Sequence, residues 1–293
     1  MAEHEDAKPA YDRGYESCIV TFIDILGFRF LINTRPSKEI VEIIEKLRDF
    51  TKPPPAHIPT SSDEMGLYSE AFSEAVSDAI VRARTYETQF GDGAFFRELN
   101  DLLIAQMQCI YAGVLIRGGL TVGNIHLGPN SVGPIFGPAM VRAFEIESQE
   151  AIYPRIVIDD AAYEEFLNNE SLRLHDHSID EEKSYVDKLL RKGEDGTLFI
   201  DYLVGARRNV DRPPQYIQFL EQHANLIRHG LRAFSAGSVR KKYLWLAHYH
   251  NSVIDNFTMK PFEIKGYSVF YKQFEEEYGV DPTDLIYSLK IKV

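Results

Sequence analysis

Apolar runs alternate with amphipathic stretches along most of the chain, and their spacing predicts alternating strands and helices. The run 19–28 is rich in β-branched and aromatic residues, which is typical of a buried strand. The apolar pattern continues over 28–34 and is interrupted by Pro36. Helical spacing over 37–50 then predicts a helix capped by Ser37, and a polar loop to residue 64 follows three prolines. The further predicted elements are a tight hairpin over 75–81, a helix over 95–115, a strand over 116–127, a helix over 137–147, a strand over 155–159, a helix over 160–168, a strand over 197–203, and helices over 213–236 and 239–257.

This order of elements predicts an α/β (α+β) fold of the ferredoxin-like type with C-terminal helical additions. A hairpin between two helical crossovers, in the order β-α-α-β-β-α-β, fits such a sandwich. We expect residues 1–16 to form a flexible leader, 17–205 the α/β domain and 206–293 a helical extension packed on it. The stretch 169–196 is charged and weakly patterned, so no element is predicted there.

Composition narrows the class of protein. The 293 residues are 44% hydrophobic and 26% charged, which is ordinary for a globular protein with a substantial core. A formal net charge of −12 argues against a non-specific nucleic-acid binder, and local cations must attract any polyanionic substrate. Cys18 and Cys109 lie in apolar runs and are expected to be core residues in a reducing compartment. Without a signal-peptide core or an 18-residue apolar segment, we expect a cytoplasmic protein that does not insert into membranes.

Two aspartates carry the candidate chemistry. Asp24 ends the first predicted strand, and Asp78 lies at the tip of the predicted hairpin. Central strands of a ferredoxin-like sheet would bring the two carboxylates together, where they repel unless a cation lies between them. Mg²⁺ or Mn²⁺ would suit such oxygen ligands, and the turn 25–28 offers N–H groups to phosphates. The alternative is that one aspartate caps a helix and the other stabilises a turn.

Several basic residues and one aromatic residue are further candidates. Arg117 and Arg142 could stabilise charge on a phosphate, although each could equally form a surface or interface salt bridge. Lys241 and Lys242 could reach a triphosphate, but paired lysines on a helix usually form a solvated face. Phe72 could stack on a base, although an aromatic side chain beside a hairpin more often belongs to the core.

These motifs resemble those of class III nucleotidyl cyclases. Residues 22–28 resemble the family's first metal motif, Phe-x-Asp-x-x-Gly-Phe, and Ser77-Asp78 resembles its Gly-Asp motif. Residues 117–123 resemble its glycine-rich strand, whose glycines suggest that a backbone or ligand approaches closely. Residues 137–147 resemble its interface helix, Gly-x-x-Val-Asn-x-x-x-Arg-Leu-Glu, except that Val141 and Glu145 replace the Asn and Arg. The residues that read adenine in the family are not retained.

Because several family motifs are changed or missing, the set of motifs that this chain retains is similar to that of the pyrimidine cyclases of the bacterial Pycsar anti-phage systems. Shared features are Ser-Asp, Arg-Gly-Gly, Gly-Pro-Ala and a late Lys-Tyr-x-Trp-Leu segment at 242–246. The resemblance implies a homodimer, with sites at its interface, that converts UTP to 3′,5′-cyclic UMP and pyrophosphate as a second messenger in defence. A cytidylate cyclase, a purine cyclase and a non-catalytic nucleotide-binding module remain alternatives.

The resemblance also implies roles for individual residues. Two Mn²⁺ or Mg²⁺ ions would be held by Asp24, Asp78 and the carbonyl of Ile25. The implied nucleotide-binding residues are Ile25, Leu26, Gly27, Phe28 and Phe72, and the implied catalytic residues are Asp24, Asp78, Arg142 and Arg117.

Overall fold

The computed structural model describes residues 14–52, 69–88, 91–128, 134–210, 213–259, 279 and 282–293. Residues 1–13 of the predicted leader and most of the predicted loop after residue 52 lie outside these ranges. The elements are β1 (Glu16–Ile25), α1 (Phe28–Thr34), α2 (Ser37–Thr51), β2 (Ala71–Val76), β3 (Ala79–Thr85), α3 (Ala94–Tyr111), β4 (Ile116–Ile125), α4 (Pro138–Glu145), the π-helix η2 (Ile146–Glu150), β5 (Ile156–Ile158), α5 (Asp160–Asn168), the 3₁₀ helix η3 (Glu170–Leu172), α6 (Ile179–Val186), β6 (Leu190–Lys192), β7 (Leu198–Ile200), α7 (Tyr202–Ala206), α8 (Pro213–Ala233), α9 (Gly237–Met259) and α11 (Pro282–Ser288).

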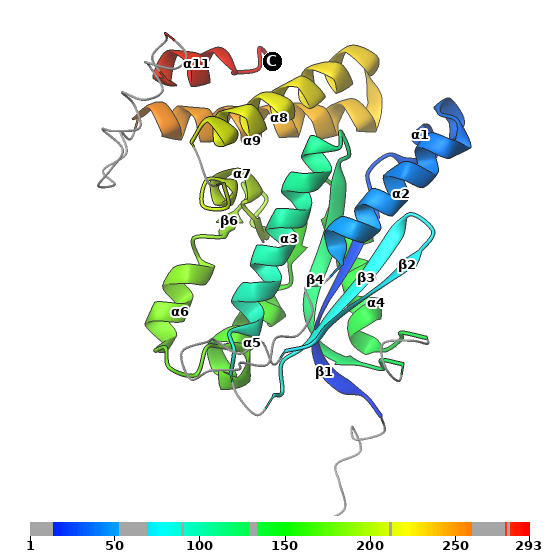
Figure 1. Ribbon diagram of the computed structural model, residues 1–293, viewed down its shortest axis with the longest axis vertical. Helices are drawn as coiled ribbons and strands as arrows, with labels where there is room; N and C mark the ends of the chain where they lie inside the picture. The colour runs from blue at the N-terminus through cyan, green and yellow to red at the C-terminus, as the bar shows by residue number, and fades with distance from the viewer. Residues whose placement is uncertain are drawn as a thin grey trace, which may run out of the picture.

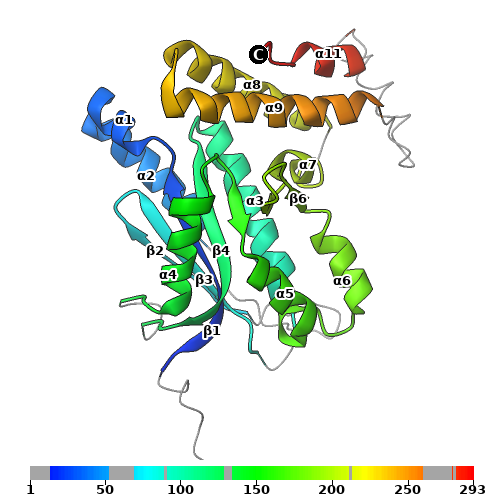
Figure 2. The ribbon, with the colours of Figure 1, turned by 180° about the vertical axis from the view of Figure 1, so that it is seen from behind.

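The strands form one mixed sheet in the order β2-β3-β1-β4-β5-β7-β6. Its first four strands pair antiparallel, and this 4-1-3-2 order confirms the predicted ferredoxin-like fold. β5 joins parallel to β4, and β7 and β6 extend the sheet antiparallel. Helices α2 and α3 cover one face and α4 the other, while α8 and α9 lie across the end where β1 finishes and β4 begins (Figures 1 and 2).

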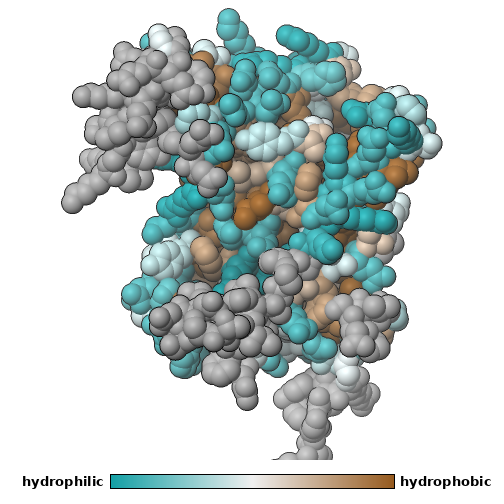
Figure 3. All heavy atoms as spheres, in the orientation of Figure 1, coloured by the Kyte–Doolittle hydropathy of each residue, from teal (hydrophilic) through white to brown (hydrophobic). Residues whose placement is uncertain are grey.

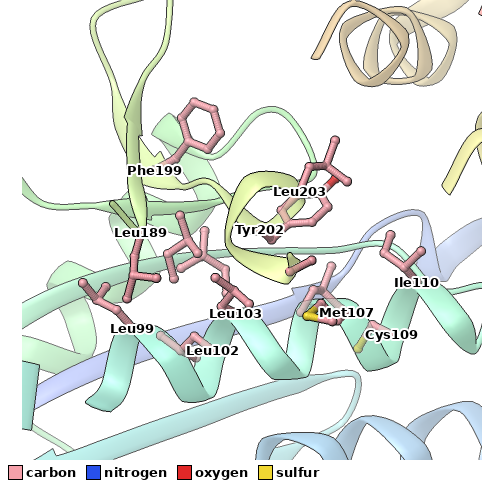
Figure 4. Packing of buried hydrophobic residues seen from close by; sticks show 14 of the residues in the cluster. Leu99, Leu102, Leu103, Met107, Cys109, Ile110, Leu189, Phe199, Tyr202 and Leu203 are labelled. Atoms are coloured by element: carbon pink, nitrogen blue, oxygen red, sulfur yellow. The ribbon is translucent and has the colours of Figure 1, made fainter. Parts of the chain in front are cut away.

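The main hydrophobic core surrounds α3. Leu99, Leu103 and their apolar neighbours on α3 are buried against the segment that runs from β6 to α7 (Figure 4). Leu203 belongs to the same core, and Gly205 gives α7 room to approach, because a Cβ there would lie 2.1 Å from Leu103 Cδ1. The many apolar residues of α3 are therefore explained by burial of this helix on two sides, against the sheet and against α7.

Some local predictions were wrong. Pro36 occupies the N-cap position of α2 and Ser37 makes no capping hydrogen bond, because the extended backbone of Pro36 already suits a helix start. The predicted strand over 197–203 ends at Ile200, since the Asp201 side chain accepts a hydrogen bond from Val204 N–H and begins α7. The segment 169–196 contains α6, begun by a Ser178–Glu181 capping box that its weak apolar pattern hid.

A buried ionic network joins β3 to α3. Arg82 Nε lies 2.6 Å from Glu98 Oε1, and Arg84 Nε lies 2.8 Å from Glu98 Oε2. Both guanidinium groups also reach Asp101 Oδ2, at 2.5 and 2.6 Å. Burial raises the pKa of Glu98, but the two arginines outweigh it and hold that pKa below its usual value. The network was not anticipated from sequence, and it holds β3 against α3.

Two sequence expectations concern the thiols and membranes. Cys18 and Cys109 are buried and form no disulfide, as expected for core residues. Burial raises the pKa of Cys109 to about 12 and that of Cys18 well above its usual value. Within the described ranges, every helix is too short or too polar to cross a bilayer.

Candidate active site

The pairing of β1 with β3 brings the two predicted acids together. Asp24 lies opposite Ala79 in this register, so Asp78, at the turn between β2 and β3, comes directly beside it. The two carboxyl groups interact electrostatically, since Asp78 adds to the raised pKa of Asp24. Ser77, the other turn residue, has a positive φ of 61°, a conformation that glycine adopts more readily than serine. The turn thus accepts backbone strain immediately next to Asp78.

On the other side of Asp24, β4 supplies a cation. Arg117 lies opposite Asp24 in the β1–β4 register, and its Nε and Nη2 each donate to Asp24 Oδ2 at 3.3 Å. Its Nη2 is also 2.6 Å from Glu147 Oε1, and its Nη1 donates to the Glu147 carbonyl at 3.4 Å. One guanidinium group therefore bridges two acids from different elements.

Glu147 reaches this site because β4 has no side chain at Gly119. A Cβ there would lie 2.5 Å from both Ala143 O and Ile146 Cβ, so only glycine allows α4 to pack this closely on β4. The glycine-rich strand was expected to be approached closely by a backbone or a ligand. In the structure, it is the backbone of α4 that approaches this strand at Gly119. Directly after this contact α4 widens into the π-helix η2, which carries Glu147. Such wide turns often occur at functional sites.

Two acids of this cluster, Asp24 and Glu147, hold their protons more tightly than isolated carboxyl groups. Burial raises the pKa of Asp24 to about 6; Arg117 opposes this shift and Asp78 adds to it. Burial likewise raises the pKa of Glu147 to about 7, again with Arg117 opposing and Asp24 adding to the shift. Both shifts show that the existing cations only partly compensate for bringing three carboxyl groups together.

A second cation comes from the C-terminal helices. Lys242 on α9 is half-buried, whereas its neighbour Lys241 is exposed. Burial lowers the pKa of Lys242 and Arg117 lowers it further, while Asp24 and Glu147 act in the opposite direction. Lys242 therefore lies within electrostatic range of the cluster. The expectation of a fully solvated lysine pair therefore holds for Lys241 only.

The residues fit a divalent metal completed by a substrate, and not a preformed protein cage. Among the described residues, no group of three or more His, Cys, Asp and Glu side chains is arranged to hold a metal ion. Asp24 and Asp78 nevertheless offer adjacent carboxylate oxygens, the hard ligands that Mg²⁺ prefers. Mg²⁺ is commonly held by one or two carboxylates together with substrate phosphates and water, which matches this pair.

The predicted phosphate-binding turn follows Asp24. Gly27 adopts the left-handed conformation, with φ of 78°, at the N-cap of α1, and its carbonyl accepts from Phe30 and Leu31 N–H. Leu26 N–H donates to Leu115 O at 2.8 Å, so that group is already used within the fold. Ile25 is buried at the end of β1. Gly27 and Phe28 therefore remain the turn residues for a phosphate contact.

Two predicted site residues lie elsewhere in this chain. Arg142 forms a bidentate pair with Asp159, both contacts at 3.0 Å, and its Nη1 is 3.0 Å from Glu150 Oε1. Asp159 also accepts from Thr121 at 2.8 Å, four residues along β4 from Arg117, or ~13 Å at strand spacing. The structure thus does not bring Arg142 to Asp24 within one chain.

Phe72 is the other distant residue. It pairs with Ala83 on β3, four residues from the Ala79 position that faces Asp24, which is again ~13 Å along the strand. Its side chain packs against the smaller core cluster under α4, which includes Val81 and Ala83. This is the core role that the sequence left open as the alternative.

Glu147 was not selected from the sequence, although a signal existed. The resembled helix motif ends in Glu, and Glu147 occupies that position, while the positions of its Asn and Arg are changed. Of the three polar positions named in that motif, only the glutamate is retained in this chain, and the structure brings this residue to the site of Asp24.

Comparisons with known proteins give only distant likenesses. No known protein family matches the chain, and no curated protein is similar to it. The guanylyl cyclase domain of the RhoGC fusion protein from the aquatic fungus Blastocladiella emersonii is similar with a TM-score of 0.38 and 14% identity, covering 64% of this chain and 95% of that one. The catalytic core of a rhodopsin-guanylyl cyclase with converted specificity, in complex with ATPαS, has a TM-score of 0.37 and 17% identity, covering 64% and 96%.

A bacterial light-regulated adenylyl cyclase has a TM-score of 0.34 and 17% identity, covering 51% of this chain and 44% of that one. Likenesses with TM-scores below 0.5 carry no functional argument, so the function has to be inferred from the residues of the site.

Proposed function

We propose that this chain is a metal-dependent nucleotide cyclase that converts a nucleoside triphosphate, with UTP as the favoured substrate, into its 3′,5′-cyclic monophosphate and pyrophosphate. The observation that carries the proposal is that the pairing of β1 with β3 places Asp78 directly beside Asp24, whose carboxylate is in contact with the guanidinium of Arg117. Neighbouring carboxylates at the ends of strands repel each other and destabilise a fold unless a bound cation or ligand offsets their charge. A triphosphate brought with divalent metal is such a ligand.

The chain's own residues suit each part of this reaction. A bound pair of Mg²⁺ or Mn²⁺ ions would lower the pKa of the ribose 3′-hydroxyl and offset the charge of the phosphates. Asp24 and Asp78 would hold these ions, with the Ile25 carbonyl as a further oxygen ligand. The 3′-oxygen bonds to the α-phosphorus, the bond from that phosphorus to the leaving oxygen breaks, and the hydroxyl proton passes to water. Arg117 would stabilise the charge that develops on the α-phosphate.

A homodimer belongs to the proposal, and the outer face of α4 supports it. Val141 and Phe144 on α4 are 58% and 47% exposed, and Phe136, two residues before α4, is 47% exposed. Exposed apolar side chains gathered on one helix are typical of an interaction surface. The face over α2, α3 and α8–α9, by contrast, is mostly hydrophilic with small separate apolar areas (Figure 3). A Val141→Glu variant should elute as a monomer in light-scattering chromatography if this helix forms the interface.

A non-catalytic nucleotide-binding module is the second candidate, and the α4 region favours it. Val141 and Glu145 stand where the resembled family has Asn and Arg. Arg142, the nearest replacement cation, is paired with Asp159 and Glu150 in its own chain. A protein with this arrangement could bind nucleotide and metal without turning the nucleotide over.

Incubation of the purified protein with Mn²⁺ and each of the four ribonucleoside triphosphates, followed by mass spectrometry, tests the proposal. Cyclic UMP and pyrophosphate are the expected products. Cyclic CMP would identify the cytidylate alternative, and a cyclic purine as sole product would identify a purine cyclase. Binding without any product would identify the non-catalytic module. We further propose that the cyclic nucleotide is a second messenger in defence against phage, as the resemblance to the Pycsar cyclases implies. Cells carrying the gene should then resist phage, and cells carrying an Asp24→Asn version should not.

A further inference from the structure

Three consecutive basic residues near the start of α9 point to different surroundings. Arg240 Nη1 donates to the carbonyls of Leu231 and Phe234, at 2.9 and 3.0 Å, and so closes the end of α8. Lys241 is exposed to solvent. Lys242 is half-buried and interacts with Asp24, Glu147 and Arg117. Of the three, only Lys242 is half-buried within electrostatic range of Asp24 and Glu147.

The position of Lys242 is set by a rigid aromatic contact one helical turn further along α9. Trp245 stacks on Tyr153, with ring centroids 5.0 Å apart and planes 6° apart. Tyr153 lies three residues after the end of the η2 segment that carries Glu147. Because residues i and i+3 share one helix face, this stack directs Lys242 and Trp245 towards the same side of the domain. Buried Leu246 and Tyr249 continue that face.

The Lys242 ammonium is available to bind a ligand, because Arg117 already pairs with two of the three acids. Asp24, Asp78 and Glu147 are three acids, and Arg117 contacts two of them directly. Lys242 lies near the same acids but forms no ion pair within 4.0 Å among the described contacts. It therefore carries a partly desolvated ammonium whose hydrogen-bond donors are not committed to the acids. An ammonium on a flexible stem suits phosphate oxygens, which it binds as a point charge.

We propose that Lys242 is a substrate-binding residue that holds the polyphosphate of the nucleotide, so that the C-terminal helices α8 and α9 complete the active site of the same chain. This inference rests on the proposed function for the identity of the substrate. It gives the helical extension a role that the ferredoxin-like core alone does not fill, since the core supplies the acids and Arg117 while α9 supplies the ammonium. The chemical class recognised is a triphosphate bound together with a divalent metal.

The test compares full-length variants with a ligand that has no base or sugar. Inorganic tripolyphosphate is titrated into the protein with Mn²⁺ by calorimetry. Lys242→Met, which keeps the apolar stem of the side chain, should weaken binding about tenfold or more, because a charged hydrogen bond is lost. Lys242→Arg should recover much of the affinity. Lys241→Met, the adjacent solvent-facing control, should stay within about twofold of wild type. Thermal unfolding checks that each variant is folded.

Kinetics with the nucleotide then separate the two proposals. If the wild type makes a cyclic nucleotide, Lys242→Met should raise KM about tenfold or more, while Lys241→Met should leave KM unchanged. A folded Lys242→Met variant with wild-type tripolyphosphate affinity and KM overturns the inference and leaves the cyclase proposal standing. If the wild type makes no product but its tripolyphosphate affinity still depends on Lys242, the cyclase proposal fails and the phosphate-binding role of Lys242 stands.

Discussion

Arg117 is a guanidinium held between two acids: its Nε and Nη2 both lie 3.3 Å from Asp24 Oδ2, and Nη2 lies 2.6 Å from Glu147 Oε1. The β1–β4 register sets the first contact, and the packing of η2 on β4 sets the second. The same positive charge therefore stabilises the cluster and is available to a bound phosphate.

Replacing either aspartate should remove activity without unfolding the protein. Asp24→Asn or Asp78→Asn should lower turnover about 10³-fold or more, since each removes a carboxylate that would hold the metal ions. Thermal stability should stay equal or rise, because one of two repelling acids is gone. Turnover and melting temperature are measured together, with exposed Asp49→Asn on α2 as the control. A double aspartate variant with wild-type turnover would refute the two-metal interpretation.

Removing Arg117 should destabilise the protein in a pH-dependent way. Arg117→Ala leaves Asp24 and Glu147 near each other without their shared cation, at a cost of about 2 kcal/mol at pH 8 for partly exposed groups. Around pH 5 both carboxyl groups are protonated, because burial raises their pKa values to about 6 and about 7, and the cost should largely disappear. Urea unfolding at the two pH values measures the difference. An equal loss at both would show that Arg117 acts through packing.

Glu147 should make the metal-free protein less stable as pH rises. Its pKa of about 7 in the folded state lies above the ordinary value of 4.5. Between these values the folded protein keeps a proton that the unfolded chain releases, so this residue's contribution to the free energy of unfolding falls as pH rises from 4.5 to 7 and is constant above. Glu147→Gln should therefore gain stability relative to wild type across this range, by about 1 kcal/mol after solvent screening.

The measurement for Glu147→Gln is the free energy of unfolding in urea at pH 5 and pH 8, with EDTA present. A difference between variant and wild type that does not change with pH would contradict the assigned linkage.

Gly119 should be needed for both stability and the site. In Gly119→Ala the new Cβ meets Ala143 O and Ile146 Cβ at 2.5 Å, and the overpacking should cost about 1–3 kcal/mol. Because the helix must move away from β4, Glu147 should also lose its contact with Arg117. Gly123→Ala is the matched control on the same strand, since its Cβ would lie 3.3 Å from its nearest neighbour, Ala139 Cβ, and so would be less crowded than a Cβ at Gly119. Melting temperatures that fall equally in both variants would argue against this close packing.

The buried network under β3 should be important for folding and independent of activity. Glu98→Gln leaves Arg82 and Arg84 without their shared carboxylate, and breaking such a buried pair costs about 3–5 kcal/mol. Because the pKa of Glu98 is held below its usual value, its stabilising contribution is present above the ordinary pKa and is lost as pH falls below it. Glu39→Gln, which breaks an exposed pair with Arg35, should change stability by less than about 1 kcal/mol.

Local pattern was enough to predict the order of strands and helices through β5 and the adjacency of Asp24 and Asp78. The hydrophobic periods that distinguish strands from helices depend only on residues close together in the sequence. A ferredoxin-like order of strands then brings the end of β1 to the β2–β3 turn. The elements that were missed, such as α6, have weak apolar periodicity because they are short and largely solvated.

The remaining members of the site were decided by tertiary packing. Glu147 joins the cluster because Gly119 lets a helix backbone rest on β4, and Lys242 joins because Trp245 stacks on Tyr153. Arg142 is drawn to Asp159 instead. By itself, the sequence determined which two acids meet at the end of the first strand. Which cations surround them depends on contacts between residues far apart in the chain, for which local spacing contains no signal.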